Sequence, residues 1–136
     1  MKMSRSEQRE QAFALVFERI FNEESIDEMV DHAAEARDLT IGDYARKAAQ
    51  GVQDHLEKID AVIEKNTVRW QKKRISKVSL AILRLAVYEM QYEDEVPVRV
   101  AINEAVELAK KYAAQEDAAF VNGLLGAVAR NQEGAQ

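Results

Sequence analysis

Residues 75–90 read ISKVSLAILRLAVYEM, and their apolar side chains cover most of the circumference of a helix. A helix that is apolar on nearly every side is enclosed by neighbouring elements. Ser76 stands directly before this run and is a favourable N-cap. The stretch therefore predicts a central helix from Ser76 to about Tyr92, buried inside a helical bundle.

One-sided apolar stripes predict further helices on both sides of this stretch. After it, Pro97 is placed to open a helix over 98–112, because its missing N–H is no loss in a first turn. Another stripe predicts a helix from about 115 to 130, with a frayed tail at 131–136. Before it, helices are expected over about 4–21, 25–36, 40–59 and 60–65, capped by Ser4 or Ser6, Ser25, Thr40 and Asp60. The pattern predicts a single all-α domain, a compact bundle of about seven helices.

Composition excludes several classes of protein. The chain has 136 residues, which fits one domain, and it contains no cysteine, which excludes disulfides, thiolate metal sites and cysteine nucleophiles. The absence of cysteine also fits a reducing cytoplasm. We find no apolar run long enough to span a membrane and no signal peptide. The expectation is a cytoplasmic protein with no membrane segment.

The sequence offers no pattern of catalytic residues. His32 and His55 are far apart, and neither belongs to a metal-binding motif. No glycine-rich phosphate loop and no nucleophile elbow is present. The carboxylates fall mostly on the predicted exposed faces of helices. We therefore expect a binding protein that is not an enzyme and has no metal or cofactor.

The charge is unevenly distributed along the chain. The net charge is −5, yet residues 65–84, here called the basic window, contain seven basic and no acidic side chains. Cations of this kind can hold phosphates, and aromatic side chains such as Phe17, Phe21 and Phe120 can serve as platforms for RNA bases. A phenylalanine at helical spacing is more often part of the core. A bundle that binds a protein partner and no nucleic acid fits the same pattern.

Several segments resemble one known family. The segments VPVRVAINEAVELAKKY (96–112) and FVNG (120–123) resemble the last two helices of the NusB family, and ISKV (75–78) with AILRLAVYE (81–89) resembles its central helix. Arg9-Glu10 followed by Ala12 resembles its first helix. The match over 75–126 is long and specific, whereas residues 22–68 match in helical pattern alone.

The resemblance implies two packed helical subdomains, about 1–66 and 67–130. It implies a transcription antitermination factor that promotes processive synthesis of ribosomal RNA. Such a factor binds boxA-type RNA together with a small-subunit ribosomal protein acting as NusE, and joins an antitermination complex on RNA polymerase.

The resemblance also implies which residues contact RNA and partner. For RNA these are Lys2, Arg5, Arg9, Phe17, Glu116 and Phe120. Ser6 and Gln8 stand where more arginine is usual, and Ala119 stands where lysine is frequent. For the ribosomal protein the candidates are Ser79, at the position of an acidic residue in the family, and Arg74, a basic residue that is not constant there.

These departures from the family pattern imply weaker RNA binding by the chain alone, or a shifted partner surface. They keep two alternatives open. The first is a helical protein-interaction module with weakened or lost RNA binding. The second is a homodimer that hides the basic amino terminus when the partner is absent.

Overall fold

The computed structural model describes residues 3–67 and 75–134, and each regular element in these two ranges is an α-helix. The predicted all-α bundle of about seven helices is confirmed. Lys2 and Arg74 lie outside the described residues, as does the rest of the basic window from 68 to 74. The helices are α1 (Arg5–Arg19), α2 (Ile26–Arg37), α3 (Asp43–Asp54), α4 (Leu56–Lys65), α6 (Lys77–Tyr92), α7 (Val98–Tyr112) and α8 (Gln115–Gly134).

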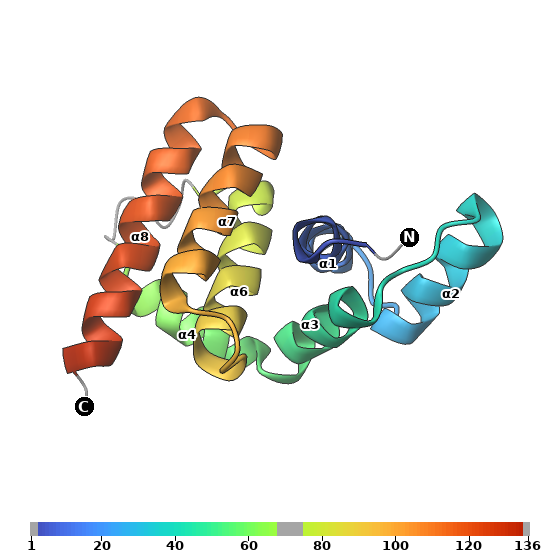
Figure 1. Cartoon of the computed structure of the whole chain (residues 1–136), viewed down its shortest axis with the longest axis horizontal. Helices are drawn as coiled ribbons and strands as arrows, with labels where there is room; N and C mark the ends of the chain where they lie inside the picture. The colour runs from blue at the N-terminus through green and yellow to red at the C-terminus, as the bar shows by residue number, and fades with distance from the viewer. Residues whose placement is uncertain (1–2, 68–74, 135–136) are drawn as a thin grey trace.

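Helix α6 lies at the centre of the bundle. It contacts α1, α3, α4, α7 and α8, with α7 and α8 on one side of it and α1 to α3 on the other (Figure 1). Ile82, Leu83, Leu85 and Val87 of α6 are each no more than 1% exposed. Burying such side chains contributes about 1.5–3 kcal/mol each. The prediction of a central buried helix is confirmed.

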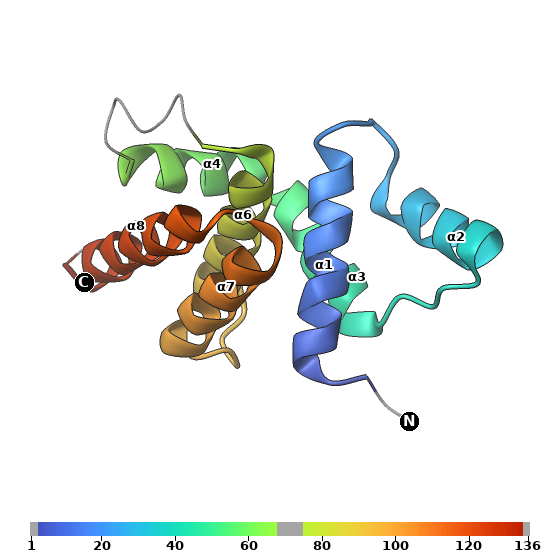
Figure 2. The ribbon, with the colours of Figure 1, turned by 90° about the horizontal axis from the view of Figure 1, so that it is seen from above.

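The other helices are arranged around α6 in two groups. Helix α2 stands at the edge remote from α8 (Figure 2) and packs on α3 and α1. Helix α1 contacts both α3 and α6, which come from either side of the predicted subdomain boundary near residue 66. The division into two subdomains stays a prediction.

Three helices begin where the sequence predicts, because a serine caps each of them. The hydroxyls of Ser4, Ser25 and Ser76 each accept a backbone N–H three positions later, at 3.0–3.1 Å. At Ser4 and Ser25 the backbone N–H of the serine also donates to the side chain of the glutamate three residues later, which completes a capping box. Helix α7 also begins directly after Pro97, as predicted.

The predicted cap of the third helix at Thr40 is wrong. Helix α3 begins at Asp43, and its N-cap Gly42 has no side chain to offer. Two glutamines of α1 replace it: Gln8 Oε1 accepts the amide of Tyr44 at 2.8 Å, and Gln11 Oε1 accepts the amide of Gly42 at 2.8 Å. The cap is thus supplied by another helix, which a local sequence pattern does not reveal.

Three further boundaries differ from the prediction. Helix α1 ends at Arg19 and not at Phe21, because Asn22 Nδ2 donates to the carbonyl of Glu18 at 3.0 Å and closes the last turn. The break between α3 and α4 falls at His55, and Asp60 lies inside α4 without capping it. Helix α8 continues to Gly134, so residues 131–134 are helical and not frayed.

Gly51 allows α3 to approach α6 closely. A Cβ atom built on Gly51 would lie 2.1 Å from Cε1 of Tyr88, well inside van der Waals contact. The Tyr88 ring has little freedom to move away, because its hydroxyl donates to Glu93 at 3.0 Å and its ring stacks on Tyr92 with centroids 5.9 Å apart. A larger residue at 51 therefore forces the two helices apart.

We predict that Gly51→Ala lowers the free energy of unfolding by roughly 1–3 kcal/mol, the usual cost of overpacking. Gly123→Ala is the matched control. Gly123 lies in α8, and a Cβ there meets nothing within 4 Å, so alanine raises stability by about 0.5–1 kcal/mol through its helix propensity. Urea denaturation followed by circular dichroism measures both, and a destabilisation of similar size in the two variants would contradict the packing argument.

Candidate nucleic-acid interface

Arg5 and Arg9 lie one turn apart on α1 but in opposite environments. Arg9 is 4% exposed, its Nε donates to Glu89 Oε2 at 2.9 Å, and its Nη1 lies 3.8 Å from Glu104 Oε1. Arg5 is exposed, and its Cζ lies 3.9 Å from the centroid of the Tyr44 ring, a cation–π contact. The structure therefore separates a buried arginine from a surface arginine within one predicted cluster.

Arg9 belongs to a buried network that joins several helices. Glu89 of α6 accepts hydrogen bonds from Arg9 of α1 and from the hydroxyl of Tyr44 of α3. Burial, and then the hydrogen bond to Glu89, raise the pKa of Tyr44 well above its ordinary value, so the tyrosine keeps its proton. We call Arg9, Tyr44 and Glu89 the buried network, and the partly exposed Glu104 of α7 lies at its edge.

The consequence for the predicted RNA contacts is direct. In this structure the guanidinium of Arg9 is occupied by carboxylates, whereas Arg5 is open to solvent, and Lys2 lies outside the described residues. The roles of all three in RNA binding stay predictions. Tyr44, Glu89 and Glu104 were not among the predicted site residues. The sequence did carry one signal for this network. Glu89 is a carboxylate on an otherwise apolar central helix, and a buried acid needs a buried partner.

Phe17 lies in a row of aromatic rings on α1. Its centroid is 6.0 Å from that of Phe13, in a stacked arrangement, and 5.2 Å from that of Phe21, edge to face. Phe17 is half-buried at the rim of the core, whereas Phe21 is exposed. The ring of Tyr112, the last residue of α7, has its centroid 5.1 Å from that of Phe13, so the end of α7 lies beside the middle of α1.

The remaining predicted RNA residues lie on α8, which begins shortly after Tyr112. Glu116 is exposed in its first turn, and Phe120, one turn later, is half-buried against the core. Asp117 caps this end, accepting the amide of Ala114 at 3.1 Å. Glu116 follows Tyr112, whose ring contacts Phe13 of α1, by four residues in the chain.

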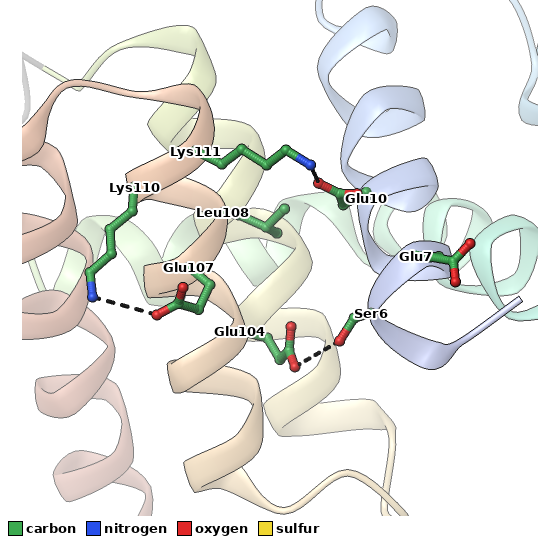
Figure 3. A pocket seen from close by; sticks show the side chains of 8 residues that line it. All are labelled: Ser6, Glu7, Glu10, Glu104, Glu107, Leu108, Lys110 and Lys111. Atoms are coloured by element: carbon green, nitrogen blue, oxygen red, sulfur yellow. Dashed lines mark hydrogen bonds and ion pairs between the residues drawn. The ribbon is translucent and has the colours of Figure 1, made fainter.

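A groove of about 520 Å³ separates α1 from α7 (Figure 3). Its walls carry four glutamates, two lysines, Ser6 and Leu108. Side chains bridge it: Ser6 Oγ donates to Glu104 at 3.0 Å, and Lys111 donates to Glu10. Hydrogen bonds from Lys111, and to a lesser degree from Tyr112, lower the pKa of Glu10. The groove is therefore acidic along its length and basic at the end formed by the last turn of α7.

The structure places Ser79 away from the surface. Its side chain is 1% exposed, and its hydroxyl is buried without a hydrogen-bond partner among the described residues. Lys77 of the same turn is exposed, whereas Arg84 is held by Asp60 in two hydrogen bonds of 2.8 and 2.9 Å. Of the two predicted partner residues, Arg74 lies outside the described ranges and Ser79 lies inside the protein.

The described residues show neither a metal centre nor a membrane helix. No group of three or more histidine or acidic side chains in the two described ranges could hold a metal ion. Among the helices of residues 3–67 and 75–134, none combines the length and the apolar character that a membrane span requires.

Comparison with known proteins identifies close relatives of the whole chain. The model of the NusB family matches residues 6–130. The transcription antitermination protein NusB of Acetivibrio thermocellus is 45% identical over 130 residues, which cover 94% of this chain and 90% of the relative. The structure of NusB from T. maritima matches with a TM-score of 0.80 at 30% identity, over 96% of this chain and 93% of that one. A chain in the structure of antitermination factors NusB and NusE in complex with dsRNA matches with a TM-score of 0.79 at 28% identity, over 95% of this chain and 99% of that one.

We predict that Arg9→Ala and Arg5→Ala differ sharply in stability. Arg9→Ala leaves the buried carboxylate of Glu89 without its cation and lowers the free energy of unfolding by roughly 3–5 kcal/mol. Arg5→Ala removes an exposed side chain and costs less than about 1 kcal/mol. Thermal and urea denaturation measure both. Equal losses would show that Arg9 is not held by the buried network.

A second pair of variants tests the assignment of Ser79 to the core. Ser79→Ala removes a buried hydroxyl that has no hydrogen-bond partner within residues 3–67 and 75–134, so we expect the free energy of unfolding to rise by about 1 kcal/mol. Ser76→Ala, the same substitution three residues earlier, removes the N-cap of α6 and should lower it by about 1 kcal/mol. Denaturation curves that move in the same direction would count against the buried position of Ser79.

Proposed function

This chain belongs to the NusB family and is a transcription antitermination protein, and we propose that it works by binding boxA-type RNA together with a ribosomal protein acting as NusE. The heterodimer would then join an antitermination complex on RNA polymerase in the cytoplasm and promote processive synthesis of ribosomal RNA. The proposal is one of binding and involves no catalytic step.

The observation that carries the proposal is the likeness of the whole fold. The chain matches, over 95% of its length, a chain in the structure of NusB and NusE in complex with dsRNA. The match is not confined to the apolar core, because the family model begins at residue 6 in the first turn of α1 and ends at residue 130 in α8. The two regions that would contact RNA, the start of α1 and the start of α8, therefore lie within or next to the matched segment.

The surface of the protein supports the same reading. Arg5 offers an exposed cation at the start of α1, Phe17 lies half-buried on α1, and Glu116 and Phe120 lie in the first turns of α8. A cation gives phosphate affinity that is independent of sequence, whereas rings and a carboxylate can contact bases. Arg9 supports this surface from inside, since it holds α1 against α6 through Glu89.

For the ribosomal partner, we propose a surface that includes the first turn of α6. Ser79 is buried, so the contact at this turn would fall on the exposed Lys77. A basic residue at this point selects a different partner side chain from the acidic residue usual in the family. The partner surface is therefore shifted in charge relative to the family pattern.

The proposal predicts that the protein binds boxA-type RNA at low salt and binds it more tightly when the ribosomal protein is present. Arg5→Ala should weaken binding several-fold and reduce the slope of log affinity against log salt by about 0.7, the value for one phosphate contact on a single strand. Arg37→Ala, which removes an exposed arginine at the end of α2, is the charge-matched control and should change neither.

Fluorescence anisotropy with labelled RNA over a range of salt measures these effects. Absence of RNA binding with the partner present would refute the proposal. If RNA binds but Arg5→Ala and Arg37→Ala behave alike, the amino-terminal cation is not part of the site. Binding to the ribosomal protein without any binding to RNA would instead favour a helical interaction module.

A further inference from the structure

Four aromatic rings form a continuous row along one side of α1 and onto the end of α7. The centroid of Tyr112 lies 5.1 Å from that of Phe13, Phe13 lies 6.0 Å from Phe17, and Phe17 lies 5.2 Å from Phe21. Phe13 and Phe17 lie one turn apart on α1, and Phe21 follows two residues after the end of the helix. We call these four residues the aromatic row.

The row is buried in the middle and open at both ends. Phe13 is 6% exposed and Phe17 is half-buried, whereas Tyr112 is 44% and Phe21 is 62% exposed. In the described part of the chain, Leu39 and Val98 are the other large apolar side chains with comparable exposure. Two of these four exposed side chains are thus the two ends of one row, joined through the buried ring of Phe13 and the half-buried ring of Phe17.

The charges at the end of α7 favour an RNA base as the occupant. Lys111 Nζ lies 5.4 Å from the centroid of the Tyr112 ring, and Lys110 in the same turn is also exposed. A ring face next to cations is the combination that binds a base together with its phosphate. Each ammonium group also lies beside a carboxylate, Lys110 with Glu107 at 3.5 Å and Lys111 with Glu10, and each has further N–H donors for a phosphate.

Glu10 holds the Tyr112 end of the row in place. Tyr112 Oη donates to Glu10 at 3.0 Å, and Lys111 donates to the same carboxylate. The tyrosine ring is therefore oriented before any ligand binds, which reduces the ordering entropy that binding costs. An ammonium group has three N–H donors, so Lys111 can keep its bond to Glu10 and still donate to a phosphate.

We propose that Tyr112 and Phe21 are further base-stacking residues, which extend the RNA contact of Phe17 in both directions along the aromatic row. The ligand is unpaired RNA, whose bases stack on the exposed rings while Lys110 and Lys111 contact the backbone at the Tyr112 end. This inference rests on the RNA-binding function proposed above. It adds two residues and two cations that the family resemblance does not assign.

The test replaces rings by leucine, which stays apolar but cannot stack. We expect Tyr112→Leu and Phe21→Leu each to weaken binding of single-stranded boxA-type RNA roughly tenfold, within the range for the loss of one stacked base. Tyr92→Leu is the matched control, because Tyr92 is a half-buried ring of α6 that stacks on His55 and lies outside the row. Circular dichroism verifies that each variant is folded before the titration.

Phe17→Leu separates the two proposals. If Phe17→Leu weakens RNA binding while Tyr112→Leu and Phe21→Leu do not, the extended row is refuted and the RNA-binding function stands. If the unaltered protein binds no RNA even with its ribosomal partner, both proposals fall. If the two end variants weaken binding of the ribosomal protein and leave RNA affinity unchanged, the surface belongs to a protein interface and the inference is wrong.

Photocross-linking gives a readout that does not depend on stability. RNA carrying 5-iodouridine at successive positions, bound to the complete protein, should cross-link to Phe17, Tyr112 and Phe21 from different positions of the strand. Cross-links to Phe17 alone would overturn the extended row. Cross-links to Tyr112 and Phe21 that disappear with unlabelled RNA as competitor would support it.

Discussion

The buried carboxylate of Glu89 is the constraint on which the arrangement of the helices depends. It lies on the most enclosed helix and is 1% exposed, so leaving it unpaired would cost several kcal/mol. Arg9 of α1 and Tyr44 of α3 supply its partners, and Glu104 of α7 lies near the same guanidinium. Hydrophobic packing alone tolerates sliding and rotation of helices, whereas this network is satisfied in one geometry, so it fixes α1 and α3 against α6.

The helices that follow from the sequence are those whose ends are determined locally. Ser4, Ser25 and Ser76 cap the helices that they precede, and each cap needs only a residue three positions away. Helix α3 could not be placed in this way, because Gln8 and Gln11 of another helix satisfy its first amides. Burial shows the same contrast between local and long-range information. An apolar run in the sequence identifies α6 as the central helix, whereas no residue near Arg9 in the sequence indicates that its side chain pairs with Glu89.

The candidate site divides along a similar line. Phe17, Glu116 and Phe120 followed from the resemblance, and the structure places a half-buried Phe17 on α1 and an exposed Glu116 and half-buried Phe120 in the first turns of α8. Tyr112 could not be found from the sequence, because it closes an apolar stripe of α7 and reads there as a core residue. Only the fold shows that its ring extends a row on α1 and remains 44% exposed. Conversely, Ser79 occupies a surface position in the family pattern, and the packing of α6 encloses it here.

The capping of α3 also accounts for the low number of cations on α1. Gln8 stands where arginine is usual in the family, and its Oε1 accepts the amides of Tyr44 and Ala45. Arginine has no acceptor atom, so an arginine at this position would leave those amides without their partner and weaken the segment that carries Tyr44. Tyr44 donates a hydrogen bond to Glu89, and its ring lies under Arg5. Loss of the Gln8 acceptor would therefore disturb both the buried network and the position of Arg5. In the RNA-binding mode proposed above, a chain with glutamine here takes phosphate-binding charge from elsewhere, and Lys110 and Lys111 stand exposed across the groove from α1.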